Sequence, residues 1–223
     1  QAYNSLKTAE RSISEIDSMQ NGEISIGATD TICKYYLMPY FKNFRKLYPG
    51  IKIHVTNRTS PKCIELLEKR IVDFSIINVP EDFRRSGISV QEISEIQDVF
   101  IAGNDFPELK DRKVGLHERE KYPVLVLEKN TTTRKYFDSL IDKFNLNIRP
   151  EIELGSVDLL VEMCRIGLGI SFVIEDSIED ALNKGEIFKL DTYEKIPPRK
   201  LGLLTSSSMP LSKAAVKFIE LLR

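Results

Sequence analysis

GEISIGATDT (residues 22–31) opens the stretch that decides the fold, because it alternates apolar and polar residues as a strand does and then ends in a polar turn. IKIHV (residues 51–55) repeats the alternation before a second turn, and VDFSIINVP (residues 72–80) is a third strand pattern. A helical pattern separates each strand from the next. This βαβαβ series predicts an α/β fold with a parallel sheet and right-handed crossovers.

The polar turns of this stretch mark where a ligand is expected. In open parallel sheets, ligands collect at the carboxyl ends of the strands, where helix N-termini offer free N–H groups. TDT (residues 29–31), TS (residues 59–60) and Asn78 fall at these places. The chain is therefore expected to bind a small molecule, and the helix N-termini favour an anion.

Each helix of this region carries its own start and stop signals. The first is expected over residues 32–47, capped by one of the residues 29–31 and ended by Pro49 and Gly50. The second is expected to begin at Pro61, with Ser60 as its cap.

The second half of the chain repeats the strand–helix logic. A strand over residues 123–127 leads through a polar turn into a helix that buries Phe137 and Leu140, and a further helix and strand meet at GLG (residues 167–169). We expect one lobe from residues 22–98 and 199–223, and a second from residues 99–198. Two crossing strands would join the lobes.

Composition and charge narrow the class of protein. Apolar residues make up 42% and charged residues 29% of the 223 residues, which is typical of a globular protein. The net charge of -1 argues against bulk electrostatic DNA binding by this segment. No apolar run approaches the ~20 residues that span a bilayer, so no membrane partner is expected.

The cysteines indicate a reducing compartment. Cys33, Cys63 and Cys164 are an odd number, widely spaced and without metal-ligand spacing. They are read as reduced thiols of a cytoplasmic protein. Cys33 lies near a helix N-terminus, where a thiol pKa can fall, so a redox role for Cys33 stays open.

The first residues form an apolar seam of helical spacing. Its members are Ala2, Leu6, Ala9, Ile13 and Ile16. The seam fits either a short coiled coil or an amphipathic helix that packs on its own domain.

An ordered set of short motifs runs along nearly the whole chain: LMP (37–39), YPGI (48–51), VDFSI (72–76) and EMCRIGLGI (162–170). In this order they resemble the effector-binding domain of LysR-type transcriptional regulators. The resemblance implies two Rossmann-like lobes in a periplasmic-binding-protein-like arrangement, preceded by the end of a linker helix at residues 1–21. It also implies a DNA-binding winged helix-turn-helix that is absent from this fragment, promoter DNA as its partner, and a homodimer or homotetramer.

The resemblance also places the effector between the lobes, on four turns. The ligand-binding residues it implies are Thr29, Asp30, Thr31, Thr59, Ser60, Asn78, Asn130, Thr131 and Thr132. Their hydroxyls and amides both donate and accept hydrogen bonds. The same residue types also serve as simple helix caps.

Three charged residues leave the charge of the effector open. Asp30 would repel an anion unless it caps its helix or pairs with a basic residue, and it could instead receive an amine, so the effector is expected to be anionic or zwitterionic. Arg58 and Arg134 flank two of the turns and could meet a carboxylate or lie in solvent.

The chain departs from the family pattern at two places. Ile174 stands where a proline is frequent, and Asn130 to Thr133 stand where Gly or Ser is frequent. These departures bear on the identity of the effector.

Two other classes of function compete with ligand sensing. A solute-binding protein of a transporter shares the two-lobe architecture but has no use for an apolar seam at its start. An enzyme would need a nucleophile with its base, a metal quartet or a phosphate loop, and neither G-x-x-x-x-G-K-[ST] nor G-x-S-x-G occurs. We therefore expect no catalysis, no cofactor and no metal.

Overall fold

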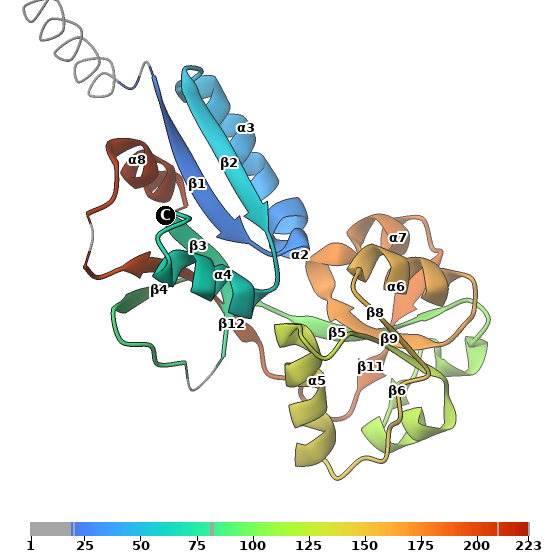
Figure 1. The fold of residues 1–223 in the computed structure, drawn as a ribbon. Coiled ribbons are helices and arrows are strands. Elements are labelled where there is room, and N and C mark those ends of the chain that lie inside the picture. Colours follow the sequence, from blue (N-terminus) through green and yellow to red (C-terminus); the bar gives the residue numbers. More distant parts are fainter. Residues whose placement is uncertain (1–18, 20, 81–82, 209, 223) are drawn as a thin grey trace, which may run out of the picture. The chain divides into compact units, whose positions relative to one another are not determined.

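The chain folds into two compact units. The computed structural model describes residues 19, 21–80, 83–208 and 210–222. The first unit comprises the described parts of residues 1–77, 82–93 and 201–223, and the second those of residues 78–81 and 94–200 (Figure 1). The proposed linker helix falls almost wholly outside the described residues. The lobe boundaries expected at residues 98 and 199 stay a prediction.

The first unit is built on a five-stranded sheet of order β2-β1-β3-β12-β4. Its strands are β1 (Gly22–Ala28), β2 (Ile51–Asn57), β3 (Phe74–Val79), β4 (Ile88–Ile96) and β12 (Arg199–Ser206). β1 pairs in parallel with β2 and with β3. The parallel sheet predicted from the alternating strands is therefore confirmed.

Helices cover both faces of this sheet. α3 (Met38–Leu47) and α8 (Lys213–Leu221) share one face, where the Phe218 ring lies 5.2 Å from Phe44 and 5.7 Å from Phe74. These rings are fully buried and form the centre of the core on that side.

The opposite face of the sheet is covered by α4 (Ser60–Glu68). Ser75 follows Phe74 in β3 and therefore points to the other side of the sheet. Its hydroxyl donates to the carbonyl oxygen of Cys63 on α4 at 3.1 Å. Alternation along one strand thus places α4 across the sheet from α3 and α8.

The helix after β1 has a wider turn that the sequence pattern did not predict. It runs as α2 (Asp30–Ile32), a π-helical segment η1 (Cys33–Leu37) and then α3, where we expected an uninterrupted helix. Pro39 lies in the first turn of α3. Proline has no N–H to donate to the preceding turn, which accounts for the local widening.

The second unit has its own five-stranded sheet, of order β10-β5-β9-β7-β8. The strands are β5 (Asp98–Gly103), β7 (Val124–Leu127), β8 (Ile152–Leu154), β9 (Ile170–Ile174) and β10 (Ile187–Lys189). β7 is parallel to β8 and β9, whereas β5 is antiparallel to β9 and β10. The unit is therefore of mixed α/β type.

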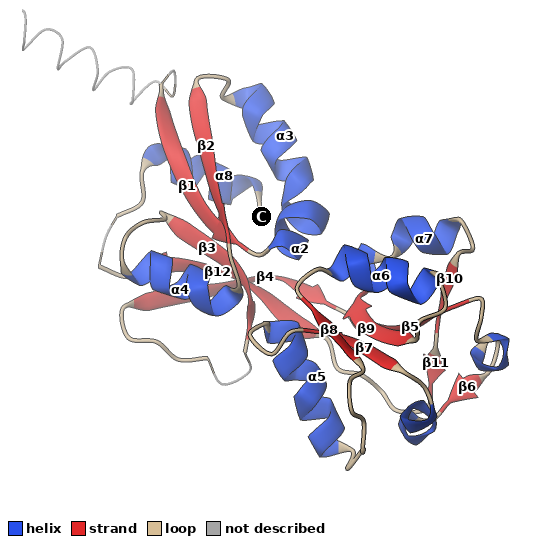
Figure 2. Cartoon of the chain, turned by 45° about the vertical axis from the view of Figure 1, so that its right-hand side comes forward, coloured by secondary structure: helices blue, strands red, loops and turns tan. Residues whose placement is uncertain are grey.

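Neighbouring residues of β5 divide the core of this unit into two layers. Phe100 packs against Phe137 of α5 (Thr132–Lys143), and Ile101 packs in the cluster of α6 (Val157–Arg165). α5 and α6 consequently cover opposite faces of the sheet, as the cartoon shows (Figure 2).

Short elements complete the second unit, and the sequence pattern did not indicate most of them. They are the 3-10 helices η2 (Pro107–Leu109), η3 (Leu116–Lys121) and η4 (Glu175–Ser177), the strands β6 (Lys113–Val114) and β11 (Asp191–Thr192), and the helix α7 (Glu179–Asn183). Across the described residues, no helix has the length and apolar character that crossing a membrane requires.

Candidate functional site

The turn after β1 is a helix cap with an exposed carboxylate beside it. The Thr29 hydroxyl oxygen accepts a hydrogen bond from the Ile32 amide at 3.3 Å, so Thr29 is the N-cap of α2. Asp30 is the first helical residue, and its carboxylate accepts a hydrogen bond from the Asn57 amide group at 2.9 Å. Thr31 follows in the first turn and is half-buried. Asp30 does not cap its helix, so its negative charge is exposed at this turn.

The turn before α4 differs from the expected arrangement. Thr59, at the N-cap position, makes no side-chain capping bond, and Ser60 is already helical, with Pro61 in the first turn. Ser60 as the cap was therefore wrong: a residue inside the first turn is not in the extended conformation that lets a cap reach the following amides. The Ser60 side chain is instead buried.

Two predicted site residues carry buried polar atoms without partners. Ser60 is 3% exposed and Asn78 is 4% exposed. Among the described residues, neither the Ser60 hydroxyl oxygen nor Asn78 Oδ1 has a hydrogen-bond partner. Buried polar atoms are paired in the great majority of cases, so each of these two needs an explanation.

In the second unit, the predicted turn forms the N-terminus of α5. The Thr131 hydroxyl accepts from the Arg134 amide at 3.1 Å and donates to the Glu128 carbonyl oxygen at 3.0 Å. Thr132 begins the helix and is half-buried, and Asn130 precedes the cap and is exposed. Thr131 is thus a cap, and Asn130 and Thr132 lie on either side of it.

The two arginines beside the turns have different surroundings. Arg58 is exposed and donates to the Asn57 carbonyl oxygen at 2.7 Å. Arg134 is 5% exposed, and its three guanidinium nitrogens are bonded. They donate to Asp138 at 2.8 Å, to the Leu127 carbonyl oxygen at 3.1 Å and to Glu153 at 3.2 Å. Arg134 is neither solvated nor available to a ligand, which corrects both expectations for it.

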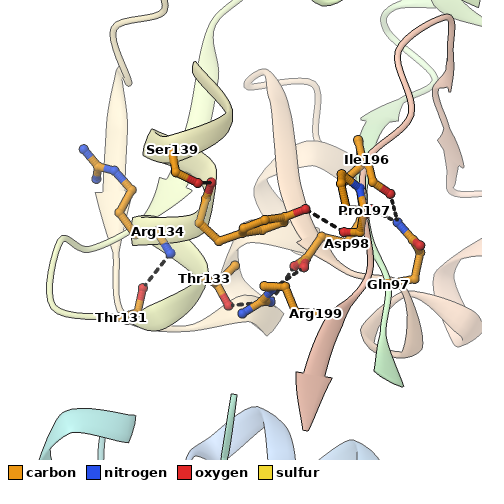
Figure 3. A network of polar contacts seen from close by, with 10 residues as sticks. Gln97, Asp98, Thr131, Thr133, Arg134, Ser139, Ile196, Pro197 and Arg199 are labelled. Carbon is orange, nitrogen blue, oxygen red and sulfur yellow. Dashed lines mark hydrogen bonds and ion pairs between the residues drawn. The ribbon is translucent and has the colours of Figure 1, made fainter. Parts of the chain in front are cut away.

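A buried ion pair beside α5 was missed by the sequence analysis. Arg199 donates from Nε to Asp98 at 2.5 Å and from one terminal nitrogen at 2.8 Å, and that same nitrogen also donates to the Thr133 hydroxyl at 3.2 Å (Figure 3). Asp98 is 0% exposed and Arg199 is 7% exposed. Burial raises the pKa of the Asp98 carboxyl, and Arg199 opposes that shift. The other terminal nitrogen of Arg199, Nη1, has no partner among the described residues.

Two further hydrogen bonds in the same region hold residues 196–197, which precede Arg199, against Gln97 and α5. Tyr136 donates from its hydroxyl to the Pro197 carbonyl oxygen at 2.6 Å, and Gln97 donates from Nε2 to the Ile196 carbonyl oxygen at 3.2 Å. A signal for the ion pair was present in the sequence: Asp98 and Arg199 each stand at the start of a strand, and their charges are opposite.

The cysteines do not form a reactive site. Burial, then the charge of Asp30, then Cys63 raise the pKa of the Cys33 thiol to about 11. Burial also raises the pKa of Cys63 to about 11 and that of Cys164 to about 12, and all three are free thiols. A redox-sensing thiol needs a lowered pKa, so the geometry does not support that role for Cys33.

The structure offers no metal site within its described residues, since no group of three His, Cys, Asp or Glu side chains is suitably placed. His54 lies 3.3 Å from Glu23, and His117 lies 3.4 Å from Glu120. Each histidine thus faces a single glutamate at the protein surface.

Comparison with known sequences gives a consistent set of relatives. The family model described as the LysR substrate binding domain matches residues 18–223. A probable RuBisCO transcriptional regulator of Cyanidium caldarium is 25% identical over 214 residues, which cover 93% of this chain and 67% of the relative. The HTH-type transcriptional activator CmpR of Synechocystis sp. is 25% identical over 211 residues, covering 94% and 68%.

Solved structures share the fold. The regulatory domain of CcmR from Synechocystis PCC6803, in complex with 2-PG, has a TM-score of 0.82 at 20% identity and covers 91% of this chain and 96% of that one. The effector-binding domain of QuiR in complex with shikimate has a TM-score of 0.78 at 18% identity, covering 91% and 95%. At these identities the likeness concerns the fold.

Proposed function

Because the chain belongs to the LysR substrate binding domain family, whose model matches residues 18–223, we propose that its polar turns bind the small-molecule effector of a transcriptional regulator. The turns are those of Thr29, Asp30 and Thr31, of Thr59 and Ser60, and of Asn130, Thr131 and Thr132, together with Asn78. The predicted position of the effector between the two units stays a prediction.

The observation that carries this proposal is the pair of buried, unpartnered polar atoms on Ser60 and Asn78. Leaving a buried donor or acceptor unsatisfied costs about 1–3 kcal/mol, and a bound molecule that pairs with both atoms removes that penalty. Both residues belong to the ligand-binding set that the sequence predicts.

The chemistry of these atoms restricts the effector. Asn78 Oδ1 only accepts hydrogen bonds, so the molecule must present an O–H or N–H group to it. Ser60 lies in the first turn of α4, where free amides and the helix dipole favour a negative group. A molecule with both features, such as a hydroxy acid or an amino acid, fits the two atoms. The solved structures in complex with 2-PG and with shikimate support a small polar metabolite as the class.

The rest of the regulator is proposed from the family. The chain spans about two thirds of the length of the curated relatives it matches. We propose that promoter DNA is bound by a winged helix-turn-helix outside this chain, and that the protein works in the cytoplasm as a homodimer or homotetramer. Ligand binding would act by shifting the populations of conformations that hold the DNA-binding parts differently. The curated relatives quoted above are transcriptional regulators rather than transporter components.

Retention of metabolites tests the proposal. The immobilised chain is incubated with a deproteinised metabolite extract of bacterial cells, washed and denatured, and the released molecules are identified by mass spectrometry. We expect the wild type to retain a small polar metabolite, and Thr31→Phe and Thr131→Phe to lose it, because an aromatic ring fills the space beside each turn. Ser139→Phe, at an exposed position on α5, is the matched control and should retain it.

Two results would count against the proposal. One is that the wild type retains no metabolite from any extract. The other is that Thr31→Phe and Thr131→Phe retain the same metabolite as Ser139→Phe. Circular dichroism of each variant checks that a loss of binding is not a loss of fold.

A further inference from the structure

Arg119 of the second unit is a buried cation without hydrogen bonds. It is 0% exposed, and its three guanidinium nitrogens have no partner among the described residues. The guanidinium carbon lies 4.1 Å from the centroid of the Phe100 ring, so a cation–π contact holds it. Arg134, which is buried in the same unit, bonds with all three nitrogens. Arg119 therefore departs from the rule that a buried charge is paired and hydrogen-bonded.

The surroundings of this guanidinium are apolar. Phe100 belongs to the same buried cluster as Leu116, which lies one turn before Arg119 on η3. Burial lowers the pKa of Arg119 to about 10, while the charges of Glu194 and Glu118 oppose this shift. The side chain stays charged at neutral pH, so folding moves a full charge out of water. This transfer weakens the closed arrangement of the region around Arg119.

The two carboxylates whose charges act on Arg119 are bonded elsewhere. Glu118 accepts a hydrogen bond from the Gly115 amide at 3.0 Å, and Glu194 accepts one from the Leu116 amide at 3.0 Å. Both carboxylates are thus committed to the start of η3. Arg119 lies within their electrostatic influence but is hydrogen-bonded to neither.

The segment that carries Arg119, residues 107–122, has little regular structure. η2 and η3 are 3-10 helices, whose hydrogen-bond geometry is poorer than that of an α-helix. β6 has two residues and pairs with β11 apart from the five-stranded sheet (Figure 2). Asp111 has a φ of 55°, a left-handed conformation that residues other than glycine rarely adopt. The segment consequently has few backbone hydrogen bonds to lose when it opens.

We propose that Arg119 keeps residues 107–122 poised to open: the segment leaves the sheet of the second unit, and the guanidinium leaves the Phe100 ring for water. Hydration of the charge offsets the loss of apolar contacts by Leu116 and its neighbours. The open form is therefore populated well above the globally unfolded chain. A molecule that binds one of the two forms better shifts this equilibrium by its difference in affinity. The inference is independent of the residues proposed to bind the effector.

Native-state hydrogen exchange of the whole chain, followed for single amides by NMR, tests the proposal. The Leu116 amide is bonded to Glu194, and the Tyr122 amide to the Arg119 carbonyl oxygen at 3.1 Å. In the wild type we expect both to be protected at least about tenfold less than the Ile170 amide of β9, which reports on opening of the sheet.

Substitutions identify the charge as the cause. Arg119→Met removes the charge but keeps an unbranched side chain, and it should slow exchange of the Leu116 and Tyr122 amides at least about tenfold. Lys121→Met is the matched control, because it removes the same charge from an exposed position of η3, and it should leave both rates unchanged. Arg119→Lys keeps a charge in the core and should exchange at least as fast as the wild type.

Several results would overturn the inference. One is that the wild type protects Leu116 and Tyr122 as strongly as Ile170. Another is that Arg119→Met exchanges as fast as the wild type or faster. A third is that Arg119→Lys exchanges as slowly as Arg119→Met, because charge would then not be the cause. Should Arg119→Met fail to fold by circular dichroism, Arg119→Leu replaces it, and failure of both would show that the cation stabilises the unit, which also overturns the inference.

Discussion

Removing the carboxylate of Asp98 should destabilise the second unit more than any surface change. The pair of Asp98 and Arg199 comprises two hydrogen bonds between charged groups, at 2.5 and 2.8 Å, with both side chains buried. At about 1.5–3 kcal/mol for each such bond, the sum is roughly 3–6 kcal/mol. Breaking buried ion pairs by removing one partner costs about 3–5 kcal/mol, because the other charge is left uncompensated. We therefore expect Asp98→Ala to lose about 3–5 kcal/mol of unfolding free energy.

Urea unfolding followed by circular dichroism measures this loss by linear extrapolation. The double variant Asp98→Leu with Arg199→Met removes both charges and should regain most of the loss, since an apolar pair of similar volume can replace a buried ion pair. Glu175→Gln is the control, because it removes an exposed ion pair with Lys189 in the same unit and should cost less than about 1 kcal/mol. A loss below about 1 kcal/mol for Asp98→Ala, or a double variant as unstable as the single one, would refute the reasoning.

Three further predictions concern the core and the thiols. Phe218→Ala should cost about 3–5 kcal/mol in the same urea assay, because its fully buried ring packs between α3 and β3; a cost under about 1 kcal/mol would contradict this packing. Gly103→Ala should lower the melting temperature, because a Cβ there would lie 2.0 Å from the Cys164 carbonyl oxygen. Gly115→Ala is the control and should leave the melting temperature unchanged, because a Cβ there would lie 3.8 Å from its nearest atom. Equal melting temperatures of the two variants would contradict the close approach at Gly103. The rate at which Cys33 reacts with iodoacetamide should rise about tenfold for each pH unit up to its pKa of about 11, because only the thiolate reacts. The Cys33→Ser variant gives the background rate of the other two thiols. A reaction rate that stops rising near pH 8 would refute the raised pKa.

The strands and most helices could be predicted because their patterns are local. GEISIGA (residues 22–28) alternates along the chain, and β1 covers the same residues. The helix caps at Thr29 and Thr131 follow from the same local chemistry, and both side chains accept from the amide three residues on. The short elements between residues 107 and 121 have no periodic pattern, so no local signal predicts them.

The site was only partly predictable, for a different physical reason. Ser60 and Asn78 are predicted ligand contacts because they lie at a helix start and a strand end, which any parallel sheet brings to one edge, and this assignment stays a prediction. Asp98 and Arg199 are 101 residues apart in the sequence, so their pairing depends on tertiary structure that no local pattern encodes. Arg134 was misread because burial by tertiary packing, not its place beside a turn, decides its partners.

A crystal structure of the chain with the metabolite it retains from a cell extract tests the central claim most directly. We predict that the bound molecule donates a hydrogen bond to Asn78 Oδ1 and pairs with the Ser60 hydroxyl, with each distance below about 3.2 Å. A molecule bound elsewhere, with both of these atoms still buried and unpaired, would contradict the account.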